Sequence, residues 1–199
     1  MQQRDILTMG IKRLADIVFS MLALLLLWPV FLLIAFIIYL DNGAPVFFLQ
    51  ERIGRGGRPF QIIKFRTMSV DAESQGPQLS FAEDKRQTRV GGFLRRYRLD
   101  ELPQFINILK GDMSLVGPRP ERSYFIEQIS QKTSDFPTLL QMRPGLTSWG
   151  QVRFGYASTV DEIIERLQYD LHYVRNFSIL FDLKVILHTI RIVFSGKGV

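Results

Sequence analysis

The chain has 199 residues, with 25 lysines and arginines against 19 aspartates and glutamates, so its formal net charge is +6. This length predicts one domain plus a membrane element, and the positive charge favours anionic lipid headgroups or phosphate-bearing substrates over nucleic acid. Because the sequence contains no cysteine, disulfides and thiolate metal sites are excluded, which is usual in a reducing compartment.

An uncharged apolar run over 17–40 predicts a membrane segment. As one straight helix its 24 residues would reach about 36 Å, enough to cross a hydrocarbon core of about 30 Å. Pro29 lies near the centre of the run and lacks the N–H that would bond the Leu25 carbonyl, so the helix should bend or break there. Two half-helices of about 18 Å each would reach just past the bilayer midplane. The length of the run therefore fits both shapes.

Basic residues flank the apolar run on both sides: Arg4, Lys12, Arg13, Arg52, Arg55, Arg58 and Lys64. Positive charge normally marks the cytoplasmic side, and a spanning helix would have to move one of the two clusters outward. A helical hairpin that turns at Pro29 keeps both clusters in the cytoplasm. The charges therefore favour a re-entrant hairpin, with a kinked spanning helix as the alternative. Residues 1–43 are predicted to form this interfacial and re-entrant membrane element, and 44–199 a cytosolic domain.

The remainder of the chain predicts an α+β fold that is mainly helical. Two short strands, 46–49 and 60–65, surround a glycine-rich turn and predict a β-hairpin, and the polar residues 70–88 predict a surface loop. Helices are predicted over 93–97, 102–110, 121–130, 159–176 and 177–194. Residues 4–16 and 177–194 mix basic and apolar positions, which is typical of amphipathic helices at a membrane interface. The C-terminal helix is predicted to lie on the membrane or to dock against the first segment.

Two adjacent carboxylates, Asp100 and Glu101, open the helix at 102–110 and follow a run of arginines that includes Arg95. A capping role at the helix N-terminus is one interpretation, because carboxylates are favoured in the first turn. The other interpretation is a site for a phosphorylated substrate and a divalent metal. A carboxylate can attack phosphorus, and Mg²⁺ takes one or two carboxylates together with substrate phosphates.

Further phosphate-binding candidates come from other segments of the chain. Arg119 lies between two prolines that stiffen the backbone, and Arg143 precedes a Pro-Gly pair. Lys64 ends the second predicted strand. Taken singly, each of these cations could equally be solvated. Asp170 follows Glu162 and Arg166 at intervals of four, so a helix-surface charge ladder is the alternative to a role in the site.

Several motifs follow one another in order: the apolar run with a central proline, KFRTM, RLDELPQ, KGDMSLVGPRP, RPGLTSWGQV and YDLHYVRN. Together they resemble the small monotopic phosphoglycosyl transferases of bacteria, also called bacterial sugar transferases. The resemblance implies transfer of a sugar 1-phosphate from a UDP-sugar to polyprenol (undecaprenyl) phosphate with release of UMP. It implies the cytoplasmic face of the bacterial inner membrane, and the first step of a surface glycan such as an exopolysaccharide, O-antigen, capsule or glycoprotein glycan.

The resemblance also implies roles for individual residues. Asp100 matches the nucleophile that takes the phosphosugar covalently, Glu101 completes the dyad as a base or metal-tuning group, and Mg²⁺ would bridge Asp100 and the diphosphate. The predicted substrate-binding residues are Lys64, Arg95, Arg119, Arg143 and Asp170. Where the family commonly has Ser-Pro at the helix break, this chain has Trp28-Pro29.

The alternative function, from a different class, is a non-enzymatic, basic binding module tethered to the membrane. Membrane lipids are predicted partners in either case, and a homo-oligomer is compatible with the sequence. The motifs do not identify the sugar or the glycan pathway.

Overall fold

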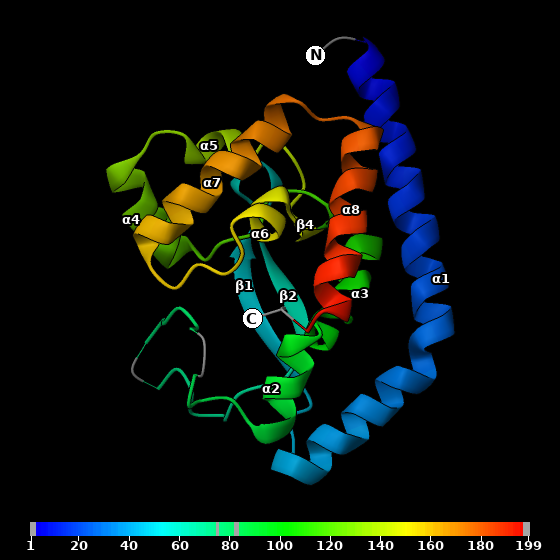
Figure 1. Ribbon diagram of the computed structural model, residues 1–199, viewed down its shortest axis with the longest axis vertical. Helices are drawn as coiled ribbons and strands as arrows, with labels where there is room; N and C mark the ends of the chain where they lie inside the picture. Colours follow the sequence, from blue (N-terminus) through cyan, green and yellow to red (C-terminus); the bar gives the residue numbers. More distant parts are fainter. Residues whose placement is uncertain (1–2, 75, 82–83, 197–199) are drawn as a thin grey trace.

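The computed structural model describes residues 3–74, 76–81 and 84–196 (Figure 1). The fold is mainly helical, as the sequence predicts, and its described residues form two small sheets where the sequence indicates one β-hairpin. Its helices are α1 (Gln3–Asn42), α2 (Arg89–Arg96), α3 (Gln104–Lys110), α4 (Ser123–Lys132), α5 (Phe136–Leu139), α6 (Trp149–Arg153), α7 (Val160–Arg175) and α8 (Ile179–Phe194). Its strands are β1 (Phe47–Ile53), β2 (Pro59–Phe65), β3 (Ser114–Val116) and β4 (Gly145–Thr147).

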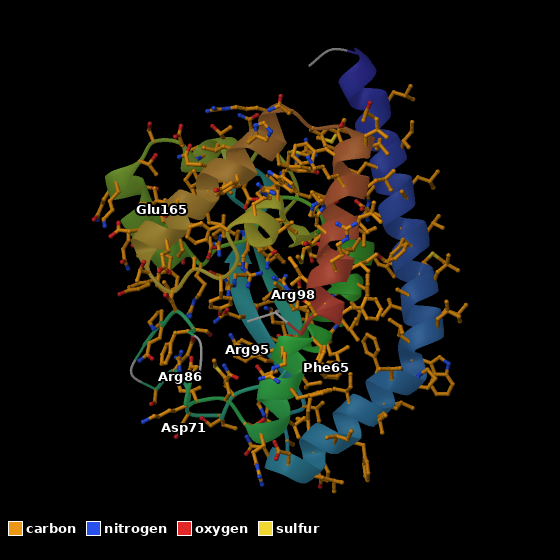
Figure 2. All side chains as sticks on the ribbon, in the orientation of Figure 1. Phe65, Asp71, Arg86, Arg95, Arg98 and Glu165 are labelled. Carbon is orange, nitrogen blue, oxygen red and sulfur yellow. The ribbon has the colours of Figure 1, made fainter. Side chains whose placement is uncertain are left out.

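Helix α1 is one helix of 40 residues that continues through Pro29, so it is not divided into two separate half-helices. Figure 1 shows it along one edge of the molecule, with a bend in its C-terminal half. Its segment Leu7–Asn42 is, within the described residues, the one helix long and apolar enough to cross a membrane, and only 11% of its most apolar window is buried. The prediction of a break at Pro29 is thus replaced by a bent, continuous helix whose apolar side chains project outward (Figure 2).

The predicted β-hairpin is confirmed, with longer strands than the sequence indicates. β1 pairs antiparallel with β2 from Phe47 opposite Phe65 to Ile53 opposite Pro59. A 3-10 turn, Arg55–Gly57, closes the hairpin, and Gly56 adopts the left-handed φ of 69° that glycine tolerates best. The hairpin runs lengthwise through the middle of the molecule (Figure 1), so its two ends present side chains to different regions.

The second sheet joins segments that lie far apart in the sequence. β3 and β4 are parallel, with Ser114 opposite Gly145 and Val116 opposite Thr147. Gly117 lies so close to the segment that leads into β4 that a Cβ on Gly117 would come within 2.3 Å of the Arg143 carbonyl oxygen. Strand β3 leads into the Pro118–Pro120 segment, whose Arg119 amide donates to Asp170 of α7.

Helix α8 docks against α1 through a buried polar cluster. Lys12 Nζ of α1 lies 2.6 Å from Asp182 Oδ2, and the Tyr173 hydroxyl donates to Asp182 Oδ1 at 2.5 Å. Of the two predicted placements of the C-terminal helix, docking against the first segment is therefore confirmed. On its outer side α8 keeps a stripe of exposed apolar residues: Leu180, Leu183, Leu187, Ile190 and Phe194.

Arg86 joins several parts of the predicted surface loop at 70–88, within the residues of the loop that the structure describes. Arg86 donates to both carboxylate oxygens of Asp84 and to the carbonyl oxygens of Leu79 and Ala72. Figure 2 shows Arg86 and Asp71 in this loop, on the side of the molecule away from α1. Described residues of this loop line the cavity that holds the candidate site described below.

Candidate active site

The two candidate carboxylates lie on a tight 3-10 turn, Leu99–Glu101, between α2 and α3. Arg98, just before the turn, adopts φ 54° and ψ 24°, a left-handed conformation that is unfavourable for an arginine. The apolar side chains of Leu94, Leu99 and Leu102 pack in the core below the turn. The turn buries Asp100 and Glu101 equally, each with 7% of its surface exposed.

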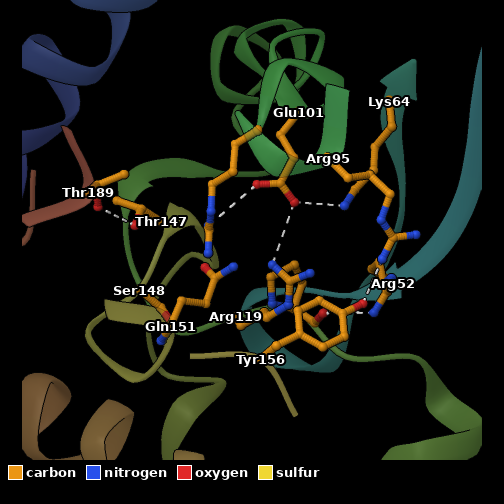
Figure 3. Close-up of polar contacts among 12 residues, drawn as sticks. Arg52, Lys64, Arg95, Glu101, Arg119, Thr147, Ser148, Gln151, Tyr156 and Thr189 are labelled. Carbon is orange, nitrogen blue, oxygen red and sulfur yellow. Dashed lines mark hydrogen bonds and ion pairs between the residues drawn. The ribbon is translucent and has the colours of Figure 1, made fainter. Parts of the chain in front are cut away.

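Three cations surround Glu101 (Figure 3). Lys64 Nζ of β2 lies 2.7 Å from its Oε1, Arg119 Nη1 lies 3.6 Å from the same oxygen, and Arg98 Nη1 lies 3.8 Å from Oε2. Burial by itself would raise the pKa of Glu101, but Lys64, Arg119 and Arg98 outweigh it and hold the pKa well below its usual range. Glu101 is therefore ionised at any physiological pH.

Asp100 is in a different electrostatic state from its neighbour. Among the described residues, none forms a hydrogen bond or a close ion pair with its carboxylate, so it does not cap α3. Burial, together with the negative charge of Glu101, raises the pKa of Asp100 to about 6, although Lys64 and Arg95 act in the opposite direction. The result is a carboxylate that is charged near neutral pH and is free to react or to bind a metal.

Both carboxylates open into a cavity of about 270 Å³ between the hairpin, the dyad turn and the loop that follows β2. Its wall contains more basic than acidic side chains, and the basic ones are Arg52, Lys64, Arg66, Arg95, Arg98, Arg119, Arg122 and Arg166. A cavity of this size with many guanidinium groups favours a ligand that carries several phosphate charges.

Three of the predicted substrate-binding residues line this cavity, namely Lys64, Arg95 and Arg119. Arg95 Nη2 donates to the Tyr156 hydroxyl at 2.9 Å, and the guanidinium also lies 6.0 Å from the centre of the Tyr156 ring. This contact joins α2 to the segment between α6 and α7 (Figure 3). The predicted residues thus converge although they come from three distant parts of the sequence.

Asp170 is buried behind the cavity and does not line it. Its Oδ1 accepts from the Gly150 amide at 2.7 Å, and its Oδ2 accepts from the Arg119 amide at 3.3 Å. Burial raises the pKa of Asp170, against which the Gly150 amide and the charge of Arg166 act. Asp170 therefore does not belong to a solvated charge ladder on α7. Its bond to the Arg119 amide positions the backbone of Arg119 instead.

Arg143 is the predicted residue that lies elsewhere. It lines a second cavity at the turn end of the hairpin and donates from Nε to the Gly111 carbonyl at 2.9 Å. Pro59 lines the same cavity as Arg143, whereas Lys64 contacts Glu101. These two residues are five positions apart along β2, which is about 17 Å at a rise of about 3.3 Å per residue. The structure does not bring Arg143 together with the dyad.

Several cavity residues were not singled out from the sequence. Arg52 donates to the Pro120 carbonyl at 3.1 Å and lies 3.5 Å from Glu121; burial lowers its pKa to about 10. Arg122 pairs with Glu73 at 2.6 Å across the cavity edge. The position of Arg98 directly before the dyad was a usable signal, whereas nothing local in the sequence marks Arg52, Arg122 or Tyr156.

The chain belongs to the family described as "Bacterial sugar transferase", whose sequence profile matches residues 7–196. It is 43% identical over 188 residues to the UDP-N-acetylgalactosamine-undecaprenyl-phosphate N-acetylgalactosaminephosphotransferase of Aeromonas hydrophila, covering 94% of this chain and 44% of that protein. It is 41% identical over 190 residues to the UDP-glucose:undecaprenyl-phosphate glucose-1-phosphate transferase of Escherichia coli K12, covering 94% of this chain and 41% of that protein.

A third relative, the UDP-glucose:undecaprenyl-phosphate glucose-1-phosphate transferase of Caulobacter vibrioides, is 42% identical over 183 residues, which is 90% of this chain and 68% of that protein. The chain thus spans about two fifths of the first two relatives and about two thirds of the third. These relatives differ in the sugar that their names specify, so similarity to them does not select one sugar.

Proposed function

We propose that the protein transfers a sugar 1-phosphate from a UDP-sugar to undecaprenyl phosphate through a covalent intermediate on Asp100, and so initiates the assembly of a surface glycan. The observation that carries this proposal is the contrast within the dyad. Glu101 is neutralised by three cations, while Asp100 has no direct partner in the described part of the chain and faces a cationic cavity. Membership of the family supports the same reaction class.

The two steps of the reaction balance without a further reactant. A carboxylate oxygen of Asp100 forms a bond to the phosphorus that carries the sugar, and the bond from this phosphorus to the bridging oxygen breaks. The electron pair leaves with that oxygen on UMP. A phosphate oxygen of undecaprenyl phosphate then attacks the same phosphorus and releases the carboxylate. Because its pKa is about 6, Asp100 is ionised at pH 7 and needs no base for the first step.

The cations of the cavity supply the electrostatic part of catalysis. A carboxylate and a diphosphate repel each other, so positive groups must lie where the charge of the phosphates develops. Lys64 and Arg119, already held by Glu101, are placed beside Asp100 for this purpose. In this proposal the donor contacts Arg95 and Tyr156, and their contact with each other at the cavity wall supports this assignment.

The site fits a Mg²⁺ ion held mainly by substrate. The described residues contain no cluster of three or more potential metal ligands, so a metal cage made by the protein alone is not present among them. Mg²⁺ commonly takes one or two carboxylates and completes its shell with phosphates and water, and Asp100 offers one such carboxylate. When bound, the ion would offset charge on the diphosphate. The remaining positive charge would come from Lys64 and Arg119.

We also propose that α1 penetrates one leaflet and that both of its ends lie on the cytoplasmic face. The bend in α1 and the basic residues on both sides of the apolar run support this topology, which would hold the dyad at the membrane surface where the lipid phosphate lies (Figure 1). Single cysteines at positions 3 and 43 of this cysteine-free chain test it. We expect both to be labelled from the cytoplasmic side, and labelling from opposite sides would establish a spanning helix.

The reaction is tested with the full chain, UDP-sugar and Mg²⁺ in the absence of acceptor. We expect a burst of UMP equal to the amount of enzyme and a labelled protein, both lost in Asp100→Asn. A direct attack by the acceptor, with the dyad acting as base, would give neither a burst nor a label. A binding module would show no Mg²⁺-dependent UDP binding at all. A parallel screen of UDP-sugars for UMP release identifies the sugar.

A further inference from the structure

The second cavity, where Arg143 lies, has a volume of about 490 Å³ and is formed by the hairpin turn and the segment after α3. Three arginines line it, Arg55, Arg58 and Arg143, and among the described residues the only carboxylate in its wall is Asp112. Three glycines of the wall, Gly54, Gly56 and Gly111, carry no side chains that could fill the space. The cavity is therefore open, concave and positively charged.

The arginines around this cavity lack carboxylate partners in the ranges that the structure describes. Arg143 uses Nε for the Gly111 carbonyl, and Arg13 of α1 uses its two terminal nitrogens for the carbonyls of Ile108 and Leu109. These bonds to the end of α3 hold both guanidiniums in place without neutralising them. Burial and the charges of Arg13 and Arg55 lower the pKa of Arg143, as expected for like charges held together.

The cationic cavity lies beside the membrane-type helix. Arg13 is four residues before the apolar run 17–40, and a Cβ on Gly111, a residue of the cavity wall, would come within 3.6 Å of its Nη2. Basic residues at the end of a membrane segment lie at the depth of the lipid phosphates. Guanidinium groups bind phosphate through paired hydrogen bonds, and an anion here would relieve the mutual repulsion of the arginines.

We propose that this cavity is a binding site for the phosphate of an anionic lipid headgroup, distinct from the cavity that holds the Asp100–Glu101 dyad. Among the described residues the two cavities share no lining residue, and Lys64, which contacts the dyad, lies about 17 Å along β2 from Pro59 in the wall of the second cavity, at about 3.3 Å per residue. An occupied headgroup site would fix the hairpin turn, the end of α3 and the N-terminal part of α1 at one depth on the bilayer.

The test is thermal unfolding of the full chain in an uncharged detergent. Its probes are short-chain phosphatidylglycerol, short-chain phosphatidylcholine and inorganic phosphate, at equal concentrations. A ligand that binds only the folded state raises the midpoint of unfolding. We expect phosphatidylglycerol to raise the midpoint by several degrees and phosphatidylcholine to leave it unchanged. The variant Arg55→Gln/Arg58→Gln should lose at least half of the phosphatidylglycerol shift, and both side chains are exposed, so the variant should fold.

The matched control is Lys85→Gln/Arg175→Gln, which removes the same charge from two exposed positions outside both cavities. It should keep the full shift. An equal shift in the Arg55→Gln/Arg58→Gln variant, or an equal shift with phosphatidylcholine, would overturn the proposal. An equal shift with inorganic phosphate would assign the cavity to a free anion and overturn the lipid source. The shift in the midpoint of unfolding that UDP induces reports on the dyad cavity and should be the same in the wild type and in both double variants. Failure of the transferase proposal can therefore be distinguished from failure of the lipid-site proposal.

Discussion

Lys64 Nζ lies 2.7 Å from Glu101 Oε1, and this ion pair between β2 and the dyad turn gives the two adjacent carboxylates different electrostatic environments. Glu101 takes the direct cation contacts and is held ionised. Burial raises the pKa of Asp100 to about 6, and the nearby cations, which do not contact it directly among the described residues, oppose this shift only in part. This difference between the two carboxylates agrees with the proposed role of Asp100 as the nucleophile.

The Glu101→Gln variant should shift the pH dependence of UMP release to lower pH. The charge of Glu101 raises the pKa of Asp100, and the substitution also leaves Lys64, Arg98 and Arg119 uncompensated beside Asp100. Both changes favour the ionised form. In the wild type, release should rise with pH through about 6; in the variant, the half-maximal point should lie lower, and the plateau rate should fall about 10²-fold.

This prediction is checked by initial rates of UMP release between pH 4.5 and pH 8 at a donor concentration well below its KM, because such rates report the ionisation of the free enzyme. Lys85→Gln, an exposed charge change outside the cavity, serves as the control and should keep the wild-type profile. A profile that stays in place or moves to higher pH in Glu101→Gln would contradict the assigned role of this residue.

The Asp100→Asn variant should be more stable than the wild type at pH 8. The pKa of Asp100 is raised from 3.8 to about 6, so the folded state binds the proton more tightly than the unfolded state does. This contribution to stability is fully present below about pH 4 and is lost as the pH rises through 6. A shift of about two pKa units corresponds to about 3 kcal/mol, which sets the upper limit of the gain at pH 8.

Thermal unfolding of both proteins at pH 8 and pH 5 measures this effect. The difference in the midpoint of unfolding should be largest at pH 8 and should shrink at pH 5. A difference that is the same at both pH values would show that the ionisation of Asp100 does not cost stability. A gain in stability on removal of the proposed nucleophile would also agree with strain being concentrated at a reactive site.

Local patterns in the sequence were sufficient for most of the elements. Two short strand segments on either side of a glycine-rich turn predicted the hairpin, and in the structure Thr159 caps α7 by accepting from the Glu162 amide at 3.2 Å. The bounds shifted by a few residues; for example, α4 begins at Ser123, which leaves Glu121 free to pair with Arg166 in the core. Such shifts depend on tertiary contacts, which a local pattern does not contain.

The parts that could not be predicted depend on contacts between distant segments. The parallel pairing of β3 with β4 involves only three residues in each strand, too few for a periodic signal. Arg143 was grouped with Arg119 because both stand beside prolines, yet the sheet places them on different cavities. The course of α1 was uncertain because Pro29 permits either a bend or a break, and the helix is continuous.

Substitutions at Asp170 should distinguish the effect of its hydrogen bonds, which position the Arg119 backbone, from the effect of its negative charge. Its two carboxylate oxygens accept from the amides of Gly150 and Arg119, and a Cβ on Gly150 would lie 3.0 Å from the Asp170 Cγ, so the contact is tight. Asp170→Ala leaves both buried amides without an acceptor and should cost about 1–3 kcal/mol of stability. Because Arg119 would lose its backbone anchor, the KM for the UDP-sugar should rise about tenfold.

The conservative Asp170→Asn variant keeps one carbonyl oxygen and should restore most of the stability and part of the KM. Steady-state kinetics of UMP release and thermal unfolding provide the two measurements. If Asn and Ala raised the KM equally while Asn restored stability, the negative charge of Asp170 and not its hydrogen bonding would be the property that matters.

Lys12→Met should detach α8 from α1. Both partners of the Lys12–Asp182 pair are nearly buried, with side-chain exposures of 8% and 10%, and removal of one partner from a buried ion pair leaves an uncompensated charge. We expect a loss of about 3 kcal/mol in the free energy of unfolding, at the lower end for such pairs because the Tyr173 hydroxyl still donates to Asp182. The double variant Lys12→Met/Asp182→Leu removes both charges and should recover more than half of this loss. Additive losses in the double variant, measured by denaturant unfolding in detergent, would show that the pair does not couple the two helices.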